Sequence, residues 1–188
     1  MNLYFDTEFT GLHKNTTLIS IGIITDEGDK FYAELTDYDK TQIDDWLQKH
    51  VIDNLILNKF IRENARDFYE NKELKESKNY SISCRGNSEY VSNELKCWLS
   101  QFNNIEIWSD CLAYDWVLFN NLFGHAFNIP NNIYYIPFDI CTLFKIKGIN
   151  PDISREEFIN NSIKGKKHNS LYDAKVIRAC YKKLINIK

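Results

Sequence analysis

The sequence predicts an α/β protein with a mixed five-stranded sheet that is flanked by helices on both faces. Three strand-like segments with short connections fill the first 35 residues, which is typical of an antiparallel meander. Two later strand-like segments alternate with amphipathic helices, an order that favours helices packed on a sheet. With only 7 Gly and 3 Pro and no low-complexity segment, we expect a single domain over residues 1–188.

The predicted meander begins almost at the first residue. Residues 2–5 alternate and place Leu3 and Phe5 on one face of a strand. Residues 17–25 form a near-continuous apolar, β-branched run, as a buried central strand needs. A polar turn with one glycine then leads to residues 30–35, where alternating apolar side chains predict the third strand.

Helices are expected in the middle of the chain. Helical spacing begins at Ile43 and continues through residues 51–57, and the polar, aperiodic stretch 71–83 predicts a solvated loop. A strong amphipathic helix follows, with Ser88 as its N-cap and an apolar stripe formed by Val91, Leu95, Trp98, Leu99 and Phe102.

Strands and helices alternate in the C-terminal half. Residues 105–108 and 133–136 predict short strands, and a helix is expected between them at residues 113–123. The final helix is expected over residues 171–185, with Asn169 or Ser170 as its N-cap.

Composition narrows the class of protein. Hydrophobic residues make up 44% of the chain and no run of 18 apolar residues occurs, so we expect no transmembrane helix and no membrane partner. The N-terminus shows no basic segment followed by a cleavage site, so no secretory signal is expected. Five widely spaced cysteines without a CxxC pair favour reduced thiols and a cytoplasmic location over disulfides or zinc.

Charge is distributed unevenly along the chain. The net charge is −3, yet residues 145–188 carry 11 Lys and Arg against 4 Asp and Glu. A basic end of this kind could follow a phosphate backbone. Exposed lysine-rich helix faces explain it as well, and charge alone favours that simpler interpretation.

Asp6 and Glu8 are two residues apart on the first strand, so both side chains point to the same face. Two adjacent carboxylates repel each other, and each is costly to remove from water. A divalent cation between them relieves both costs, and carboxylate oxygens suit Mg²⁺ or Mn²⁺. Taken alone, the pair is more simply explained as an exposed acidic strand end that leads into a turn.

Two further acids lie on the apolar stripes of predicted helices. Asp115 shares its face with Leu118, Phe119 and Leu122, although an acid in a first helical turn is also favoured by the helix dipole. Asp173 lies on the stripe of Ile177, Cys180 and Leu184, so its carboxylate is expected to face the sheet.

His168 lies in the predicted loop before the last helix. A histidine with an ordinary pKa near neutrality can act as a general base toward a water molecule. A lone loop histidine is more often an idle surface residue. No role is expected for His13, His50 and His125, which are interpreted as structural.

Together these residues resemble the motifs of the DEDDh 3′–5′ exonucleases, which have a ribonuclease H-like fold. The first motif is Asp6-Thr7-Glu8 within DTEFTGL, the second ends at Asp115 in DCLAYD, and the third runs from His168 to Asp173. Asp110 replaces the usual asparagine of the second motif, and we expect it to support the turn. Within that family the chain is similar to small stand-alone exoribonucleases whose first motif begins DTEF.

The resemblance implies a role for each motif residue. Asp6 would bridge two divalent cations, Mg²⁺ or Mn²⁺, with Glu8 and Asp173 completing the shell of one and Asp115 holding the other. His168 would take the proton of the attacking water. Residues after the first motif and lysines before His168 would contact the terminal nucleotide and its phosphates, namely Phe9, Thr10, Leu12, Lys164, Lys166 and Lys167. For the three lysines a solvated loop is nearly as good an explanation.

The resemblance therefore implies a metal-dependent 3′–5′ exonuclease that acts on single-stranded 3′ ends, with RNA favoured over DNA. A DNA exonuclease and a nuclease-dead nucleic-acid-binding module remain alternatives, because recognition of the 2′-hydroxyl is not legible in the motifs. Homodimers are common among the small relatives, and no interface is legible in the sequence. An endonuclease on the same fold is disfavoured by the spacing of the third motif.

Overall fold

The computed structural model describes residues 1–58 and 80–187, which form an α/β fold around one mixed sheet. The strand order is β4-β3-β2-β1-β5-β6. The strands are β1 (Asn2–Phe9), β2 (Leu18–Thr25), β3 (Lys30–Leu35), β4 (Ser81–Gly86), β5 (Glu106–Ser109) and β6 (Phe138–Asp139). The α/β class and the mixed sheet are thus confirmed, but the predicted number of five strands is wrong because the described sheet has six.

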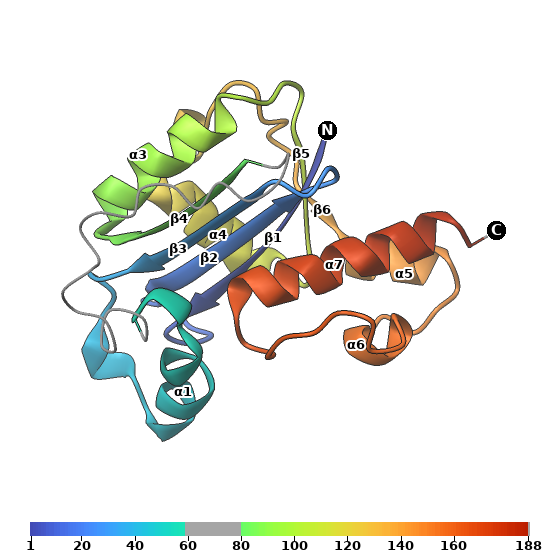
Figure 1. Cartoon of the computed structure of the whole chain (residues 1–188), viewed down its shortest axis with the longest axis horizontal. Coiled ribbons are helices and arrows are strands. Elements are labelled where there is room, and N and C mark those ends of the chain that lie inside the picture. The colour runs from blue at the N-terminus through green and yellow to red at the C-terminus, as the bar shows by residue number, and fades with distance from the viewer. Residues whose placement is uncertain (59–79, 188) are drawn as a thin grey trace.

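The first three strands form the predicted meander, and β1 lies at the centre of the sheet (Figure 1). β1 pairs antiparallel with β2 and parallel with β5, and β5 pairs parallel with β6. β1 continues past the alternating residues 2–5 through Glu8 to Phe9, so both acids of the first motif lie on this strand, as expected.

The additional strand, β4, begins inside the stretch predicted to be a loop. Residues 71–79 of that stretch lie outside the described residues, whereas Ser81 to Gly86 pair in parallel with β3. This strand lies at the edge of the sheet and carries polar side chains. Polar edge strands are a common protection against aggregation, and their low hydrophobicity resembles that of a loop.

The last predicted strand is displaced along the chain. Of residues 133–136, only Ile133 pairs, in an isolated bridge with Ile105. The strand β6 instead comprises Phe138 and Asp139, which pair with Trp108 and Ser109. Pro137 lies between the two segments and has no N–H to donate to a ladder, so regular pairing begins only after it.

Helices cover both faces of the sheet, as predicted. In Figure 1, α7 (Ser170–Ile185) crosses in front of the strands and α4 (Ala113–Leu122) lies behind them. The core on the α4 side also contains α3 (Ser88–Leu99), and the core on the α7 side also contains α5 (Ile140–Ile146) and α6 (Arg155–Phe158). None of the described helices combines the length and apolarity that crossing a membrane requires.

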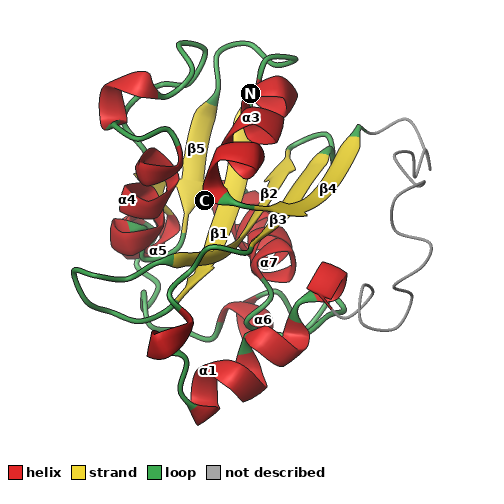
Figure 2. Cartoon of the chain, turned by 90° about the vertical axis from the view of Figure 1, so that its left-hand side faces the viewer, coloured by secondary structure: helices red, strands yellow, loops and turns green. Residues whose placement is uncertain are grey.

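A third, smaller cluster packs the segment after the meander against the sheet. It joins Ile19 to α1 (Asp45–His50) and to the 3-10 helix η2 (Ile52–Asn54). Figure 2 shows α1 and α6 beyond the same end of the strands. Two more short 3-10 helices are η1 (Lys40–Gln42) and η3 (Ala126–Asn128).

Two of the predicted helix boundaries are wrong. The helix expected to continue from Ile43 through residue 57 ends at His50, where the Asn54 side chain donates to the His50 carbonyl and a separate 3-10 turn begins. The N-cap of α3 is Asn87, not Ser88, because Asn87 Oδ1 accepts from Tyr90 N at 2.9 Å. At α7, Asn169 is confirmed as the cap, since its Oδ1 accepts from Tyr172 N.

One glycine allows α7 to approach the sheet closely. A Cβ on Gly22 of β2 would lie 2.2 Å from Leu171 N and 2.3 Å from Ser170 C, which leaves no space for a side chain. Beside it, the hydroxyl oxygens of Ser20 and Ser170 lie 3.0 Å apart in the interior. Gly22 pairs with Asp6 in the ladder, so this contact brings the start of α7 next to the first acid of β1.

Candidate active site

Three carboxylates from two elements meet where the start of α7 lies on β1. Asp6 and Glu8 are on the same face of β1, and Asp173 is in the first turn of α7. Ligand oxygens of these three residues all lie within 4.8 Å of one another. The structure therefore brings together the acids of the first and third motifs, which are 165 residues apart or more along the chain.

Asp115 reaches the same region from the other face of the sheet. It is in the first turn of α4 and only 6% exposed. Its Oδ1 accepts two hydrogen bonds from Thr7, from the backbone N at 2.9 Å and from the hydroxyl at 2.6 Å. Thr7, whose side chain alternates with those of Asp6 and Glu8, thus fixes Asp115 to β1. Sequence reasoning missed this role, although Thr7 lies inside the first motif.

Burial raises the pKa values of all four carboxyl groups, and repulsion by the other acids of the site raises those of Asp6 and Glu8 further. Burial raises the pKa of Asp6 well above its usual range, and the charges of Asp115, Asp173 and Glu8 raise it further. Burial, followed by the charges of Asp173 and Asp115, raises the pKa of Glu8 to about 8. Mainly through burial, the pKa of Asp115 rises to about 6 and that of Asp173 to about 7.

Within residues 1–58 and 80–187 no ion pair balances this negative charge, although the charge of Lys167 lowers the pKa of Asp173. In that part of the chain none of the ion pairs involves the four acids, and no hydrogen bond reaches the side-chain oxygens of Asp6 or Glu8. Carboxylates left without donors at close range are the ligands that Mg²⁺ and Mn²⁺ prefer. The donor set thus fits hard divalent cations.

His168 lies at the edge of this cluster, in the loop that leads into α7. Its backbone is in the left-handed region at φ +62°, and its ring packs edge-on against Trp46 of α1 at 5.0 Å between centroids. His50 stacks on the same Trp46 at 4.8 Å. Burial first, and then the charges of Lys167 and His50, lower the pKa of His168, which favours the neutral imidazole that can accept a proton.

Trp46 and His50 are the neighbours of His168 that sequence reasoning missed. They are four residues apart on α1 and therefore share one face of the helix. That spacing was a usable signal, but nothing in the sequence indicates that this face meets the loop before α7. His13 and His125 lie elsewhere, next to Gly11 and at the N-terminus of η3.

The residues after the first motif differ in their accessibility. Leu12 is 76% exposed and projects from the loop that connects β1 and β2. Phe9 stacks on Tyr114 of α4 with ring centroids 5.6 Å apart. The Thr10 hydroxyl is turned inward, where it accepts from Thr17 N at 2.9 Å and donates to Gln42. Leu12 is thus free for a ligand, whereas the Thr10 side chain holds the loop together.

The three lysines lie in the exposed loop before His168. Lys166 Nζ donates to Asn54 Oδ1 at 3.4 Å, and Lys167 Nζ lies 3.8 Å from Glu156 Oε1. Lys164 is exposed. All three lysines are therefore accessible from solvent.

Asp110, which differs from the family pattern, is held by an arginine. Arg155 of α6 donates from Nε to Asp110 Oδ2 at 2.7 Å and from Nη2 to Oδ1 at 2.9 Å. This paired contact links the turn after β5 to α6. It provides the turn support that was expected of this position.

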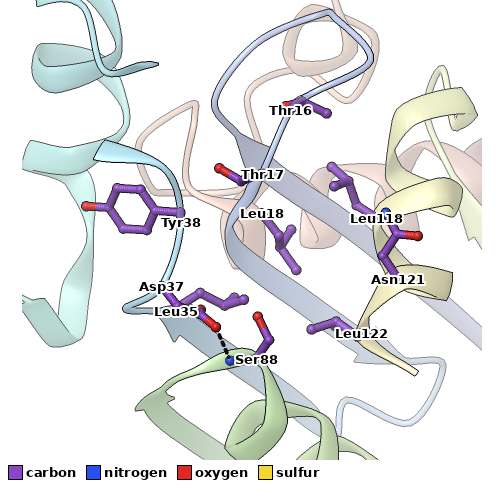
Figure 3. Close-up of a pocket in the computed structure, with 10 residues that line it drawn as sticks. All are labelled: Thr16, Thr17, Leu18, Leu35, Asp37, Tyr38, Ser88, Leu118, Asn121 and Leu122. Carbon is purple, nitrogen blue, oxygen red and sulfur yellow. Dashed lines mark hydrogen bonds between the residues drawn. The ribbon is translucent and has the colours of Figure 1, made fainter. Parts of the chain in front are cut away.

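A separate pocket lies on the α4 side of the sheet and is not the acid site (Figure 3). It is bordered by the start of β2, the end of β3 and the first residue of α3, where Ser88 N donates to Asp37 Oδ2 at 2.9 Å. Leu118, Asn121 and Leu122 of α4 form its opposite wall. None of the predicted site residues lines it.

The sheet order and the acid cluster define a ribonuclease H-like α/β protein with a carboxylate site. The fold is similar to that of the Mg²⁺- and Mn²⁺-bound Pop2p of S. pombe, with a TM-score of 0.55 at 13% sequence identity. That similarity covers 97% of this chain and 82% of the Pop2p chain. At this level of identity it supports the fold alone.

Sequence comparison identifies the family. The model of the 3′–5′ exoribonuclease Rv2179c-like domain matches residues 1–185, so the chain belongs to the Rv2179c-like family of 3′–5′ exoribonuclease domains. The chain is also 34% identical over 55 residues to the 3′–5′ exoribonuclease Rv2179c of Mycobacterium tuberculosis strain H37Rv, and equally to MT2234.1 of strain CDC 1551. These matches span 29% of this chain and 33% of the length of each relative.

Proposed function

We propose that this chain is a metal-dependent 3′–5′ exoribonuclease of the DEDDh type, which hydrolyses single-stranded RNA from its 3′ end to 5′-mononucleotides. The observation that carries the proposal is the group of oxygens from Asp6, Glu8 and Asp173 within 4.8 Å of one another, without an ion pair to a protein cation among the described residues. The family membership supports a 3′–5′ exoribonuclease, and we propose that residues 1–188 act as one such domain.

Four acids would hold two divalent cations. Asp6, at the centre of the cluster, would bind both. Glu8 and Asp173 would complete the ligands of one and Asp115 would hold the other, directly or through water. Bound Mg²⁺ or Mn²⁺ would stabilise the attacking and leaving oxygens during in-line hydrolysis of the phosphodiester. The raised pKa values of the acids are a property of the metal-free site, because a cation favours their charged forms.

His168 would accept the proton of the attacking water at an imidazole nitrogen. Its lowered pKa favours the neutral form at neutral pH, as a general base requires. Its edge-on contact with Trp46 limits how far the ring can turn. The left-handed backbone at His168 lets the loop turn sharply into α7.

The exposed Leu12 would separate the last two bases of the substrate, with Phe9 and the backbone at Thr10 beside the terminal nucleotide. Phe9 is already packed on Tyr114, so little side-chain freedom would be lost on binding. Lys164, Lys166 and Lys167 would neutralise phosphates next to His168.

The test is a time course with 5′-labelled single-stranded RNA and DNA of the same sequence, with Mg²⁺, Mn²⁺ or EDTA. The proposal expects a descending ladder from the 3′ end of RNA, release of 5′-mononucleotides, and no reaction in EDTA. RNA with a 3′-phosphate should be degraded more slowly, because it adds charge where a hydroxyl is expected. Cleavage of circular single-stranded RNA, or full activity in EDTA, would refute the proposed reaction.

A further inference from the structure

Two cysteines that are 30 residues apart in the chain place their sulfurs in contact. Cys111 Sγ lies 3.5 Å from Cys141 Sγ. Cys111 is exposed and Cys141 is partly buried, so one thiol of the pair is open to solvent. Within the described residues no other two cysteine sulfurs make such a contact. The remaining cysteines, Cys84, Cys97 and Cys180, are separate thiols.

The backbone around these thiols is fixed by one carboxylate. Asp139 Oδ1 accepts from Cys141 N at 2.7 Å, and its Oδ2 accepts from Leu112 N at 3.2 Å. Cys111, directly before Leu112, has a left-handed backbone with φ +53°, a conformation that needs support from surrounding contacts. Asp139 thus holds the backbone of Cys141 and the residue after Cys111 close together, which keeps the two cysteines side by side.

A metal site is the obvious alternative for this group, because ligand atoms of Asp110, Cys111 and Cys141 lie within 4.8 Å of one another. The Arg155 guanidinium, however, already contacts two of these three residues, Asp110 and Cys141. Besides its two bonds to Asp110, its Nη2 lies 3.2 Å from Cys141 Sγ. A metal cation bound to these atoms would lie against a guanidinium that is always protonated. The cluster therefore does not suit a cation.

We propose that Cys111 and Cys141 are a redox modification site, which hydrogen peroxide converts into a reversible intrachain disulfide. The Cys111 thiolate attacks one peroxide oxygen, which gives a sulfenic acid and hydroxide. The Cys141 thiol then attacks the Cys111 sulfur, an S–S bond forms, and the hydroxyl leaves as water with the thiol proton. Overall, two thiols are oxidised, one peroxide is reduced, and two water molecules are formed.

Oxidation would act on the turn that positions Asp115. This turn, residues 110–112, leads directly into α4, and Asp115 is in the first turn of that helix. A disulfide bond is about 2.05 Å long, so the sulfurs must approach each other from 3.5 Å. The Asp139 contacts and the Asp110–Arg155 pair join this turn to its neighbours, and we expect part of the movement to reach the start of α4. We therefore expect slower hydrolysis in the oxidised protein, a part of the inference that rests on the proposed function.

The first experiment tests the cross-link without measuring activity. The purified full chain is treated with hydrogen peroxide, alkylated, digested without reduction and analysed by mass spectrometry. A peptide linking Cys111 to Cys141, absent after treatment with dithiothreitol, is the expected result. Cys111→Ser and Cys141→Ser should each abolish it, whereas Cys97→Ser, which removes a separate exposed thiol, should not. Overoxidised Cys111 without a link, or zinc released in stoichiometric amount, would overturn the proposal.

The second experiment measures RNA hydrolysis before oxidation, after it, and after reduction. We expect the rate to fall by about tenfold or more and to recover with dithiothreitol, since misplacing a catalytic group by about 1 Å can cost about 10²-fold. Cys111→Ser should be insensitive to peroxide and Cys97→Ser should respond like the wild type. A cross-linked protein with an unchanged rate would refute the effect on the site. A reduced protein without activity would count against the proposed function instead.

Discussion

At the scale of single residues, the four acids differ in how their charge is balanced. Asp115 accepts two hydrogen bonds from Thr7, whereas Asp6 and Glu8 receive none from the described residues. The bonds from Thr7 lower the pKa of Asp115 against the larger effect of burial. Asp115 is therefore the acid whose charge and orientation depend most directly on one neighbouring side chain.

Thr7→Val tests this dependence, because it keeps the shape of the side chain and removes the hydroxyl. Loss of the 2.6 Å bond should raise the pKa of Asp115 and loosen its side chain. We expect metal affinity or activity to fall by about 10–100-fold, as is typical when the partner of a metal ligand is removed. Titration with Mn²⁺ by calorimetry measures the change. Thr142→Val, on the exposed face of α5, is the matched control and should bind Mn²⁺ normally.

His168 should contribute to proton transfer without contributing to metal binding. His168→Ala is expected to keep the Mn²⁺ affinity of the wild type and to lose about 10²–10⁴-fold in the rate of hydrolysis, the usual contribution of a positioned base. Calorimetry and single-turnover assays separate the two effects. His125→Ala, at the exposed helix η3, is the matched histidine control. Near-normal turnover of His168→Ala would show that another group takes the proton.

At the scale of elements, the site depends on how closely α7 approaches the sheet at Gly22. Gly22→Ala would place a methyl group 2.2 Å from Leu171 N and push the first turn of α7 outward. Asp173 lies in that turn, so metal affinity should fall together with stability. Small-to-large changes in packed interiors cost typically about 1–3 kcal/mol.

Thermal unfolding with and without Mn²⁺ tests the role of Gly22. The matched control is Ile24→Val in the same strand, which should cost about 0.5–1.5 kcal/mol and leave the Mn²⁺-induced stabilisation unchanged. If Gly22→Ala kept the full Mn²⁺ effect, the close contact between α7 and β2 would not position Asp173.

Some features of these elements could be predicted from the sequence, and others could not. Periodicity alone places Asp173 on the buried stripe of α7, and the spacing of Asp6 and Glu8 places both on one face of β1. Contacts between distant segments leave no such pattern. Neither Gly22 beneath Leu171 nor the pair Cys111 and Cys141 has a local signal, because each depends on how elements pack in three dimensions. Strand β4 was not predicted because strands were identified by their runs of hydrophobic residues. This edge strand is mostly accessible to solvent and its sequence is polar.

At the scale of the whole molecule, the acid cluster should make stability depend on pH in the absence of metal. Carboxyl groups in an unfolded chain titrate near pH 4, whereas the pKa is about 6 for Asp115, about 7 for Asp173 and about 8 for Glu8. Between pH 4 and pH 8 the folded protein therefore holds more protons than the unfolded chain. Its free energy of unfolding should fall as pH rises, by about 1.4 kcal/mol per pH unit for each extra proton.

Melting temperatures in EDTA between pH 5 and pH 8 measure this loss. Mn²⁺ binds the charged acids and stabilises the folded state by mass action, so the difference between Mn²⁺ and EDTA should widen as pH rises. A melting temperature in EDTA that stays constant or increases over this range would contradict the raised pKa values of Glu8, Asp115 and Asp173.

Asp6→Asn separates two effects of the acid cluster on stability, namely destabilisation in the absence of metal and stabilisation when Mn²⁺ binds. The substitution keeps the size of the side chain and removes the acid at the centre of the cluster. In EDTA at pH 8 the variant should melt a few degrees above the wild type, since about 1 kcal/mol shifts the melting temperature of a domain of this size by about 2–4 °C. In Mn²⁺ the order should reverse, because the wild type gains stability and the variant does not. Glu106→Gln, an exposed acid on β5 outside the cluster, should follow the wild type in both conditions. A variant less stable than the wild type in EDTA would mean that Asp6 contributes to the fold itself and not only to binding a cation.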